Sequence, residues 1–177
     1  MPLPVKKRKA MAKTLGLTNP MAHPRLEKIV INVGVGDATQ DKKRIGVVVD
    51  HLRRITGQKP VVTKARRSVA NFKLREGNAI GCMVTMRGGR MESFLERLVN
   101  IVIPRIRDFR GLRPRLDGHG NFTVGIKEQG VFPEIPFEAI GTTRRGFSIT
   151  IVTTAKDDAE GLALLRAWGV PFIEEEK

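Results

Sequence analysis

Apolar residues that alternate with polar or small ones predict several short strands. In residues 26–36, Ile31 and Val33 fall on one side of a strand and Asn32 falls on the other. Residues 80–87 alternate in the same way. Shorter strand-like stretches occur at residues 60–63, 121–128 and 147–154. Each strand is therefore expected to bury one side, and the opposite side need not be buried.

A repeat of apolar residues every three or four positions predicts three helices. Residues 41–55 and 90–103 each have an apolar stripe along one side, and a proline ends or kinks the second helix. Residues 157–168 form the third, with Asp157 and Glu160 at the spacing of a capping box. Together these strands and helices predict a small α+β body.

A charged, turn-rich segment separates two of the predicted strands, at residues 64–78. Its apolar residues follow no sustained helical or strand period, and a loop of this length is usually functional or disordered. The cations that precede its first acid, Glu76, are Lys59, Lys64, Arg66, Arg67, Lys73 and Arg75. Charge of one sign suggests a phosphate backbone as partner. We therefore predict that this loop reaches out from the α+β body and touches RNA.

The charge of the whole chain points the same way. There are 32 Lys and Arg against 18 Asp and Glu, which gives a net charge of +14 and a pI near 10.7. Nucleic acid is the commonest explanation, and an anionic membrane surface is the second. No apolar run approaches the ~20 residues of a spanning helix, and the basic N-terminus lacks the apolar block of a secretory signal. The lone Cys82 excludes an internal disulfide and fits a reducing compartment.

Length and composition predict one domain. At 177 residues and 41% hydrophobic, the chain can bury one core, and no linker is long enough to split it. We expect a single domain over residues 1–177. It consists of a basic N-terminal arm at 1–20, a core at 21–172 and an acidic tail at 173–177. In the arm, a short helix at 5–15 that orders on binding competes with a frayed, solvated terminus, which is favoured in the absence of a partner.

No pattern of residues in the sequence indicates a catalytic site. The three histidines are scattered, and His51 is expected to be a solvated surface residue, not a metal ligand. Cys82 is expected to be a small core residue. The turn Gly34-Val35-Gly36 lacks the third glycine of a dinucleotide-binding motif, so it more simply ends a strand. We predict no catalytic residue, metal or cofactor, although an enzyme that binds a nucleotide at this turn stays open as an alternative.

A second arginine cluster follows the helix at 90–103. Gly111 and Pro114 interrupt it, and a solvated turn competes with an interaction surface, which is slightly favoured. Its arginines are Arg105, Arg107, Arg110, Arg113 and Arg115. A general basic nucleic-acid chaperone or nucleoid-type protein, which would bind DNA and RNA alike, is a further alternative.

A series of segments resembles one known family. In chain order they are IVINVGVG (29–36), ITGQKPVVTKARRSVANFKLREG (55–77), IGCMVTMRG (80–88), PRIRDFRGL (104–112), GNFTVGIKEQ (120–129), FPEI (132–135), IVTTA (151–155) and GVPF (169–172). They resemble the bacterial form of the universal large-subunit ribosomal protein five, a 5S rRNA-binding family of the central protuberance. The resemblance extends from about Leu15 to Phe172 in order, which makes it far more specific than any one motif.

The resemblance implies a fold and a set of contacts. It implies an antiparallel β-sheet with helices packed on one face and 5S rRNA on the other. The implied 5S rRNA-binding residues are Asn32, Gln58 and Thr85, with Lys59 and Arg87 beside them. The implied tRNA-contacting loop contains Lys64, Arg66, Arg67, Lys73 and Arg75. The implied intersubunit bridge region contains Arg107, Arg110, Arg113, Arg144 and Arg145.

The implied partners are those of a ribosomal protein in the cytoplasm. They are 5S rRNA, 23S rRNA, P-site tRNA, a small-subunit head protein and neighbouring large-subunit proteins, with no membrane. The sequence departs from the family at three positions: Val33 stands where methionine is common, Phe122 where tyrosine is common, and Gly89 where a charged residue is usual. None of these departures affects the three polar residues implied to bind 5S rRNA.

Overall fold

The structure is a computed structural model that describes residues 15–16, 19–39, 43–136 and 145–173. Residues 1–14 of the expected arm, with nearly all of its predicted helix, lie outside these ranges. So do the glutamates of the expected acidic tail and Arg144. All other residues implied to bind RNA or to form the bridge are described.

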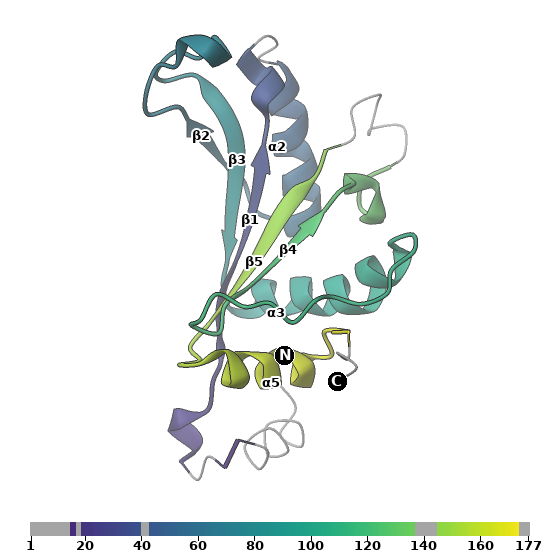
Figure 1. The fold of residues 1–177 in the computed structure, drawn as a ribbon. Coiled ribbons are helices and arrows are strands. Elements are labelled where there is room, and N and C mark those ends of the chain that lie inside the picture. Colours follow the sequence, from purple (N-terminus) through teal and green to yellow (C-terminus); the bar gives the residue numbers. More distant parts are fainter. Residues whose placement is uncertain (1–14, 17–18, 40–42, 137–144, 174–177) are drawn as a thin grey trace. The chain divides into compact units, whose positions relative to one another are not determined.

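Five strands form one antiparallel sheet in the order β2-β3-β1-β5-β4 (Figure 1). Alternating burial along β1 and β5 matches the alternation that predicts them. The strands are β1 (Leu26–Gly34), β2 (Val61–Lys64), β3 (Ala79–Met86), β4 (Phe122–Ile126) and β5 (Phe147–Thr153). The predicted strands are all present, and their ends differ from the predicted ones by at most two residues.

The part of the chain that the structure describes contains three α-helices beside the sheet, so the predicted α+β fold with helices packed on an antiparallel sheet is confirmed. They are α2 (Lys43–Thr56), α3 (Gly88–Arg97) and α5 (Asp158–Trp168). Short 3-10 helices lie at η1 (Pro20–Ala22), η2 (Gly36–Thr39), η3 (Ala70–Phe72), η5 (Ile103–Arg105) and η6 (Gln129–Val131).

The helix predicted at 90–103 differs at its end. After α3 the chain continues as a π-helical turn, η4 (Leu98–Val102), and then as η5. Pro104 lies in η5 and has no N–H to donate, and its ring crowds the carbonyl one turn earlier. The widened turn before the proline is consistent with this steric effect.

The helix at 157–168 does not form the predicted capping box, because Glu160 bonds to the residue before the N-cap and not to the N-cap N–H. Asp157 is the N-cap residue, but its side chain makes no capping hydrogen bond. The Glu160 carboxylate accepts a hydrogen bond from the N–H of Lys156 at 3.0 Å. Gly169, with φ of 90°, follows the last residue of the helix in the left-handed conformation that commonly ends helices.

The described residues belong to two compact units. Unit 1 comprises the described residues within 1–29, 86–124 and 150–177, and unit 2 comprises those within 30–85 and 125–149. The boundaries fall inside strands, so the chain crosses between the units several times. The expectation of a single domain over residues 1–177 remains a prediction.

The core of unit 2 lies between α2 and one face of the sheet (Figure 1). Its buried side chains come from alternate positions of β1 and β3 and from one side of α2: Ile31, Val33, Cys82, Val84, Ile45, Val48, Leu52 and Ile55. Cys82 is thus a core residue as predicted, and burial raises the pKa of its thiol.

His51 corrects the sequence prediction, because it is not a solvated surface residue. It is 5% exposed, and its Nδ1 lies 3.2 Å from Oε1 of Gln129, which is also buried. On α2 it lies three residues after Val48 and four before Ile55, both buried, so the helical period places it on the apolar side. The polar ring is accommodated there because the Gln129 amide supplies a hydrogen-bond partner.

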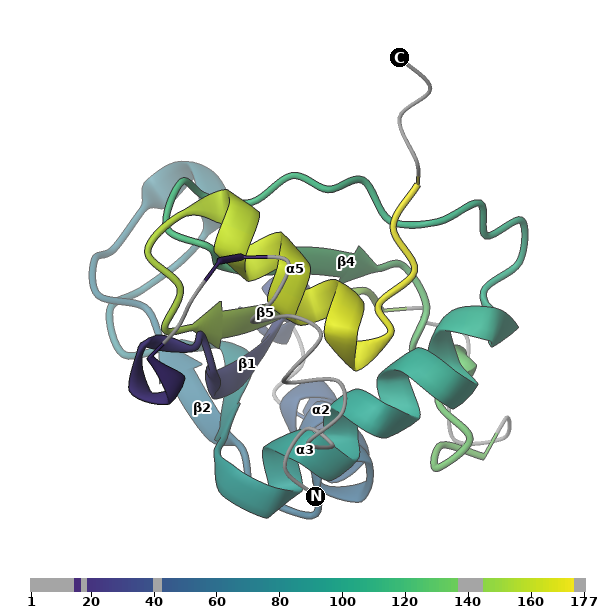
Figure 2. The same cartoon turned by 90° about the horizontal axis from the view of Figure 1, so that it is seen from below.

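Unit 1 packs α3 and α5 together. Figure 2 shows α5 beside α3. Just beyond these helices, a Cβ added to Gly169 would lie 3.6 Å from Cγ1 of Val99 in η4. The buried side chains of α3 and η4 include Met91, Phe94, Leu95, Leu98 and Val102. Trp168 is half-buried and packs against Leu164, as expected of a core residue.

Two carboxylates fix the turn before β4 in unit 1. Asp158 accepts hydrogen bonds from the N–H groups of Gly118 and Gly120 at 2.9 and 3.0 Å. Asp117 accepts from the side chain of Asn121 and from the N–H groups of His119 and Asn121. These hydrogen bonds, with the Asn121 side chain first, lower the pKa of Asp117 to about 2.

The single-domain prediction can be tested with two residues that occur once each in the chain. Trp168 reports on unit 1 and Cys82 reports on unit 2. If the units unfold together, Trp168 fluorescence and the alkylation of Cys82 will show the same midpoint in urea. A fluorescence transition that is complete while Cys82 is still protected would show two separately folding domains.

Candidate nucleic-acid interface

The face of unit 2 opposite to its core is open among the described residues. On β1, Ile31 and Val33 are buried while Asn32 between them is exposed. On β3, Met83 and Thr85 are half-buried and alternate with core residues. The same alternation that fills the core therefore lines up a second set of side chains on the other side of the sheet.

Hydrogen bonds indicate the register of this open face. The N–H of Val35 donates to the carbonyl of Ile80 at 2.8 Å. Counting back along the antiparallel strands from this pair puts Asn32 beside Met83. On the other side of β3, Met83 is paired with Val61 of β2, which is 63% exposed. Asn32, Met83 and Val61 thus form one row across three strands.

We call this surface the outer face. Besides the half-buried Val30, it consists of six side chains on the open side of β1, β2, β3 and β5 in unit 2: Asn32, Val61, Thr63, Met83, Thr85 and Ser148. The hydroxyl of Ser148 donates to the carbonyl of Asn32 at 3.5 Å. All six side chains are uncharged, and several can both donate and accept hydrogen bonds.

Gln58 joins the outer face from the end of α2. Gly57 has φ of 66°, which turns the chain out of the helix. The hydroxyl of Thr56 donates to the carbonyl of Leu52 at 2.7 Å and accepts from the N–H of Gln58 at 3.2 Å. The Gln58 amide then donates to the carbonyl of Thr85 at 3.2 Å. The structure thus brings together Gln58 and Thr85, which lie 27 positions apart.

The remaining residues of the implied 5S rRNA site are also accessible. Lys59 is exposed next to Gln58. Arg87 is exposed just after β3, although it belongs to unit 1. The alternation in residues 80–87 predicts Met83 on this face, but not as a contact. Three further residues of the outer face are not predicted from the sequence: Val61, Thr63 and Ser148. Strand periodicity was the available signal for Ser148, since it alternates with Phe147 and Ile149, which are both buried.

The basic segment between β2 and β3 is an ordered hairpin loop, and Figure 1 shows it extending beyond the ends of these strands. At its base, the N–H of Ala65 donates to the carbonyl of Asn78 at 2.8 Å. Near its tip, Val69 and Leu74 exchange two backbone hydrogen bonds of 2.9 and 3.1 Å. We call residues 64–78 the basic loop.

The cations of the basic loop are all solvent-exposed. They are Lys64, Arg66, Arg67, Lys73 and Arg75. Lys73 has φ of 51°, a left-handed conformation that lets its N–H donate to the carbonyl of Ala70 at 2.9 Å. This tight turn explains why the apolar residues of the loop follow no regular period. A row of exposed cations on a supported backbone suits a polyanion.

The second arginine cluster is extended and exposed in unit 1. Leu112 pairs with Phe172 in an isolated parallel bridge, with hydrogen bonds of 2.8 Å from its N–H to Pro171 and 2.9 Å from Ile173 to its carbonyl. These bonds tie the middle of the cluster to the segment after α5. Arg107, Arg110 and Arg113 are exposed on either side of Leu112.

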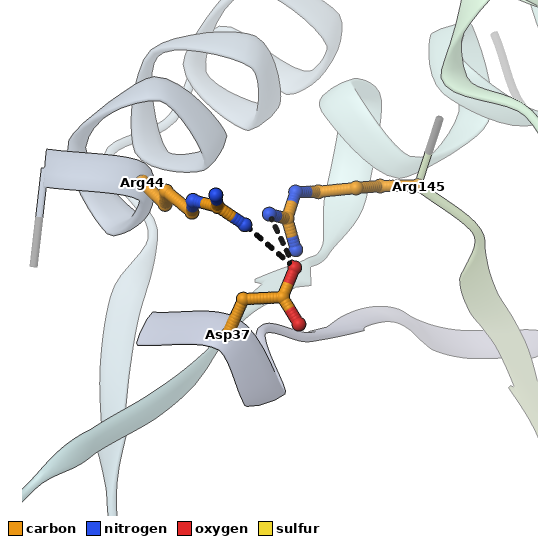
Figure 3. Close-up of polar contacts among 3 residues, drawn as sticks. All are labelled: Asp37, Arg44 and Arg145. Atoms are coloured by element: carbon orange, nitrogen blue, oxygen red, sulfur yellow. Dashed lines mark hydrogen bonds and ion pairs between the residues drawn. The ribbon is translucent and has the colours of Figure 1, made fainter. Parts of the chain in front are cut away.

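Arg145 differs from those arginines because an ion pair engages it. In unit 2, Oδ2 of Asp37 accepts from Arg44 at 2.9 Å and from Arg145 at 3.4 Å (Figure 3). The Arg145 side chain is only 12% exposed. Asp37 thereby joins η2, the start of α2 and the residues before β5. The structure does not bring Arg145 into the same unit as Arg107, Arg110 and Arg113.

The described residues include no cluster of three or more His, Cys, Asp or Glu that could hold a metal ion. Among the same residues, no helix has both the length and the apolar character needed to cross a bilayer.

Two family models match the chain. The model described as ribosomal protein L5 matches residues 19–75, and the model for the C-terminus of the same ribosomal family matches residues 79–172. The gap between the two matches lies at the end of the basic loop. Together they cover every element that contributes to the outer face.

Similar curated proteins are named large ribosomal subunit protein uL5. The protein of Solibacter usitatus is 56% identical over 164 residues, covering 92% of this chain and 91% of its own. The protein of Anaeromyxobacter sp. (strain Fw109-5) is 55% identical over 166 residues, covering 93% and 92%. That of Moorella thermoacetica is 55% identical over 168 residues, covering 94% and 93%.

The ion pairs of Asp37 can be tested by replacing it with its uncharged isostere. In Asp37→Asn, Arg44 and Arg145 lose their shared carboxylate and repel each other. We expect the free energy of unfolding to fall by about 1 kcal/mol, because one arginine is largely buried while the other groups are half exposed. The measurement is urea unfolding at low salt, with a smaller difference expected at high salt.

Asp50→Asn is the matched control, since Asp50 is an exposed aspartate of α2 in the same unit. It should change the free energy of unfolding by less than about 0.5 kcal/mol. Equal effects of the two substitutions would show that the Asp37 contacts add no stability beyond the charge itself.

Proposed function

The chain belongs to the ribosomal protein L5 family, and from this premise we propose that it is a structural constituent of the large ribosomal subunit that binds 5S rRNA. The outer face is the proposed 5S rRNA-binding surface, which would help attach that RNA in the central protuberance. The gathering of Asn32, Gln58 and Thr85 at one open, uncharged side of unit 2 is the observation that supports this proposal most.

Physical chemistry favours folded RNA over a flexible strand as the ligand of the outer face. Single-strand binding proteins present several aromatic side chains on which bases stack. The outer face has none, and its Asn, Thr and Ser side chains can instead bond to 2′-hydroxyls and base edges. A sheet is also a rigid support, so little conformational entropy is lost when a folded RNA docks on it.

The exposed cations support the other proposed contacts. We propose that the basic loop meets P-site tRNA, and that the segment with Arg107, Arg110 and Arg113 meets a small-subunit head protein in an intersubunit bridge. Arg145 would act there by supporting the nearby backbone, because Asp37 already binds it. The further proposed partners are 23S rRNA and neighbouring large-subunit proteins.

The rival functions make different predictions about binding. A nucleoid-type protein would bind duplex DNA about as well as 5S rRNA at the same salt concentration, whereas the proposed function requires a preference for 5S rRNA. An enzymatic function has no support from the relatives, which are named as ribosomal proteins. We expect the protein to reside in the cytoplasm, within ribosomes.

The proposal can be tested with a charge placed on the outer face. Asn32→Asp keeps the size of an exposed side chain but sets a carboxylate against the RNA backbone. We expect 5S rRNA binding to weaken at least about tenfold, because like charges at an interface are strongly unfavourable. Gln58→Ala is a less specific change, since it also removes the hydrogen bond to Thr85 and costs about 1 kcal/mol of stability.

The matched control is Asn100→Asp, an exposed asparagine of η4 in unit 1. It changes the net charge equally and should leave 5S rRNA binding within about twofold of the unmodified protein. Binding is measured by fluorescence anisotropy at fixed salt. If both variants weaken binding equally, the outer face is not the 5S rRNA site.

A further inference from the structure

Phe72 lies at the tip of the basic loop with its ring in solvent. It is 75% exposed, whereas every other Phe or Trp side chain among the described residues is buried or half-buried. An aromatic side chain contributes most to stability when it is buried, so this position forgoes that contribution. Among the described residues of unit 2, none buries this ring.

Backbone hydrogen bonds fix the position of Phe72 even though its side chain is exposed to solvent. It is the last residue of η3, between Val69 and Leu74, which exchange two backbone hydrogen bonds. The left-handed turn at Lys73 closes the same tip through its bond to Ala70. The N–H of Glu76 also donates a hydrogen bond of 2.9 Å to the hydroxyl of Ser68, which connects the two sides of the loop. The ring is therefore displayed on a supported turn.

The surroundings of the ring indicate the chemistry of its partner. Exposed Arg66, Arg67, Lys73 and Arg75 lie within six positions of it, and Glu76 is the one acid of the basic loop. A partner that binds both the cations and a flat apolar ring must carry phosphate groups next to a planar ring on which Phe72 can stack. RNA has both features in each nucleotide.

We propose that Phe72 stacks on one exposed base of the tRNA that the basic loop contacts, while the neighbouring cations bind the flanking phosphates. This inference rests on the proposed tRNA contact. It adds the residue that supplies the part of the tRNA-binding free energy that does not depend on salt. A single phenyl ring can stack on a single base. That base must have one face that is not already stacked on a neighbouring base, as in a loop or at the end of a helix. Because the turn is already formed, little conformational entropy is lost on stacking.

The experiment compares Phe72→Ala with a variant of reduced charge. Full-length protein is titrated with a tRNA transcript at several salt concentrations. We expect Phe72→Ala to weaken binding about tenfold and to leave the slope of log K against log salt unchanged, because stacking releases no counterions. The variant Arg66→Gln/Arg67→Gln/Lys73→Gln should lower that slope by about 0.7–0.9 for each phosphate that is no longer neutralised.

Two further variants make the test specific. Val47→Ala, at a residue of α2 that is 49% exposed, controls for the loss of an exposed apolar side chain and should bind tRNA normally. Phe72→Trp in a Trp168→Phe background should keep its affinity, and its fluorescence should be quenched on binding because indole stacks on a base. Urea midpoints of Phe72→Ala and the unmodified protein should agree, since the ring packs little.

The outcomes separate this inference from the proposed function. Normal tRNA binding by Phe72→Ala, with a lowered slope in the charge variant, would overturn base stacking and leave the tRNA contact standing. Normal binding and an unchanged slope in both variants would show that the basic loop does not contact tRNA. Unquenched fluorescence of the Phe72→Trp variant at full affinity would also overturn stacking, and would direct attention to an apolar pocket on a protein partner.

Discussion

The two-residue alternation of β1 and β3 is the constraint on which the outer face depends. Ile31, Val33, Cys82 and Val84 are buried on one side of these strands, and Asn32 lies on the other. A slip of one residue would put Asn32 into the core and expose its apolar neighbours. The hydrophobic effect that stabilises unit 2 therefore also sets which polar groups are available for binding.

A glycine and a side-chain hydrogen bond help to keep that register fixed. A Cβ on Gly81 would lie 2.7 Å from the carbonyl oxygen of Val33 and 2.9 Å from the hydroxyl of Thr63. Only glycine permits this close approach of β1, β2 and β3 without a shift of backbone. Gln58 then bonds to Thr85 across the same face. The outer face is thus determined by packing on its reverse side and by bonds within it.

The charged side chains and the uncharged hydrogen-bonding side chains lie on different parts of the surface. The outer face is uncharged, whereas the cations lie on the basic loop beyond the strands and on the segment around Leu112. Cations on extended segments can follow phosphates and add salt-dependent affinity, while a neutral sheet face can match the shape of a folded RNA. This division suits a protein that holds one RNA on a fixed surface and reaches others with its loops.

The strands, the helices and the exposed side of Asn32 could be predicted from the sequence because they follow local periods of two or about 3.6 residues, whereas the role of Asn32 is implied only by the family resemblance. The contact between Asp37 and Arg145 could not, since 108 positions separate them and only the folded sheet brings them near. The order of the basic loop depends on a left-handed residue, Lys73, which no local pattern marks. The burial of His51 could have been predicted from the sequence, because its spacing from Val48 and Ile55 puts it on the apolar side of α2.

The most direct test of the outer face is hydroxyl-radical footprinting of the full-length protein with and without 5S rRNA. Met83 and Val61 lie on the outer face, and Val47 lies on α2 of the same unit. If the sheet seats on the RNA, oxidation of Met83 and Val61 will fall on binding and oxidation of Val47 will not change. Protection of Val47 with Met83 and Val61 still reactive would contradict the account.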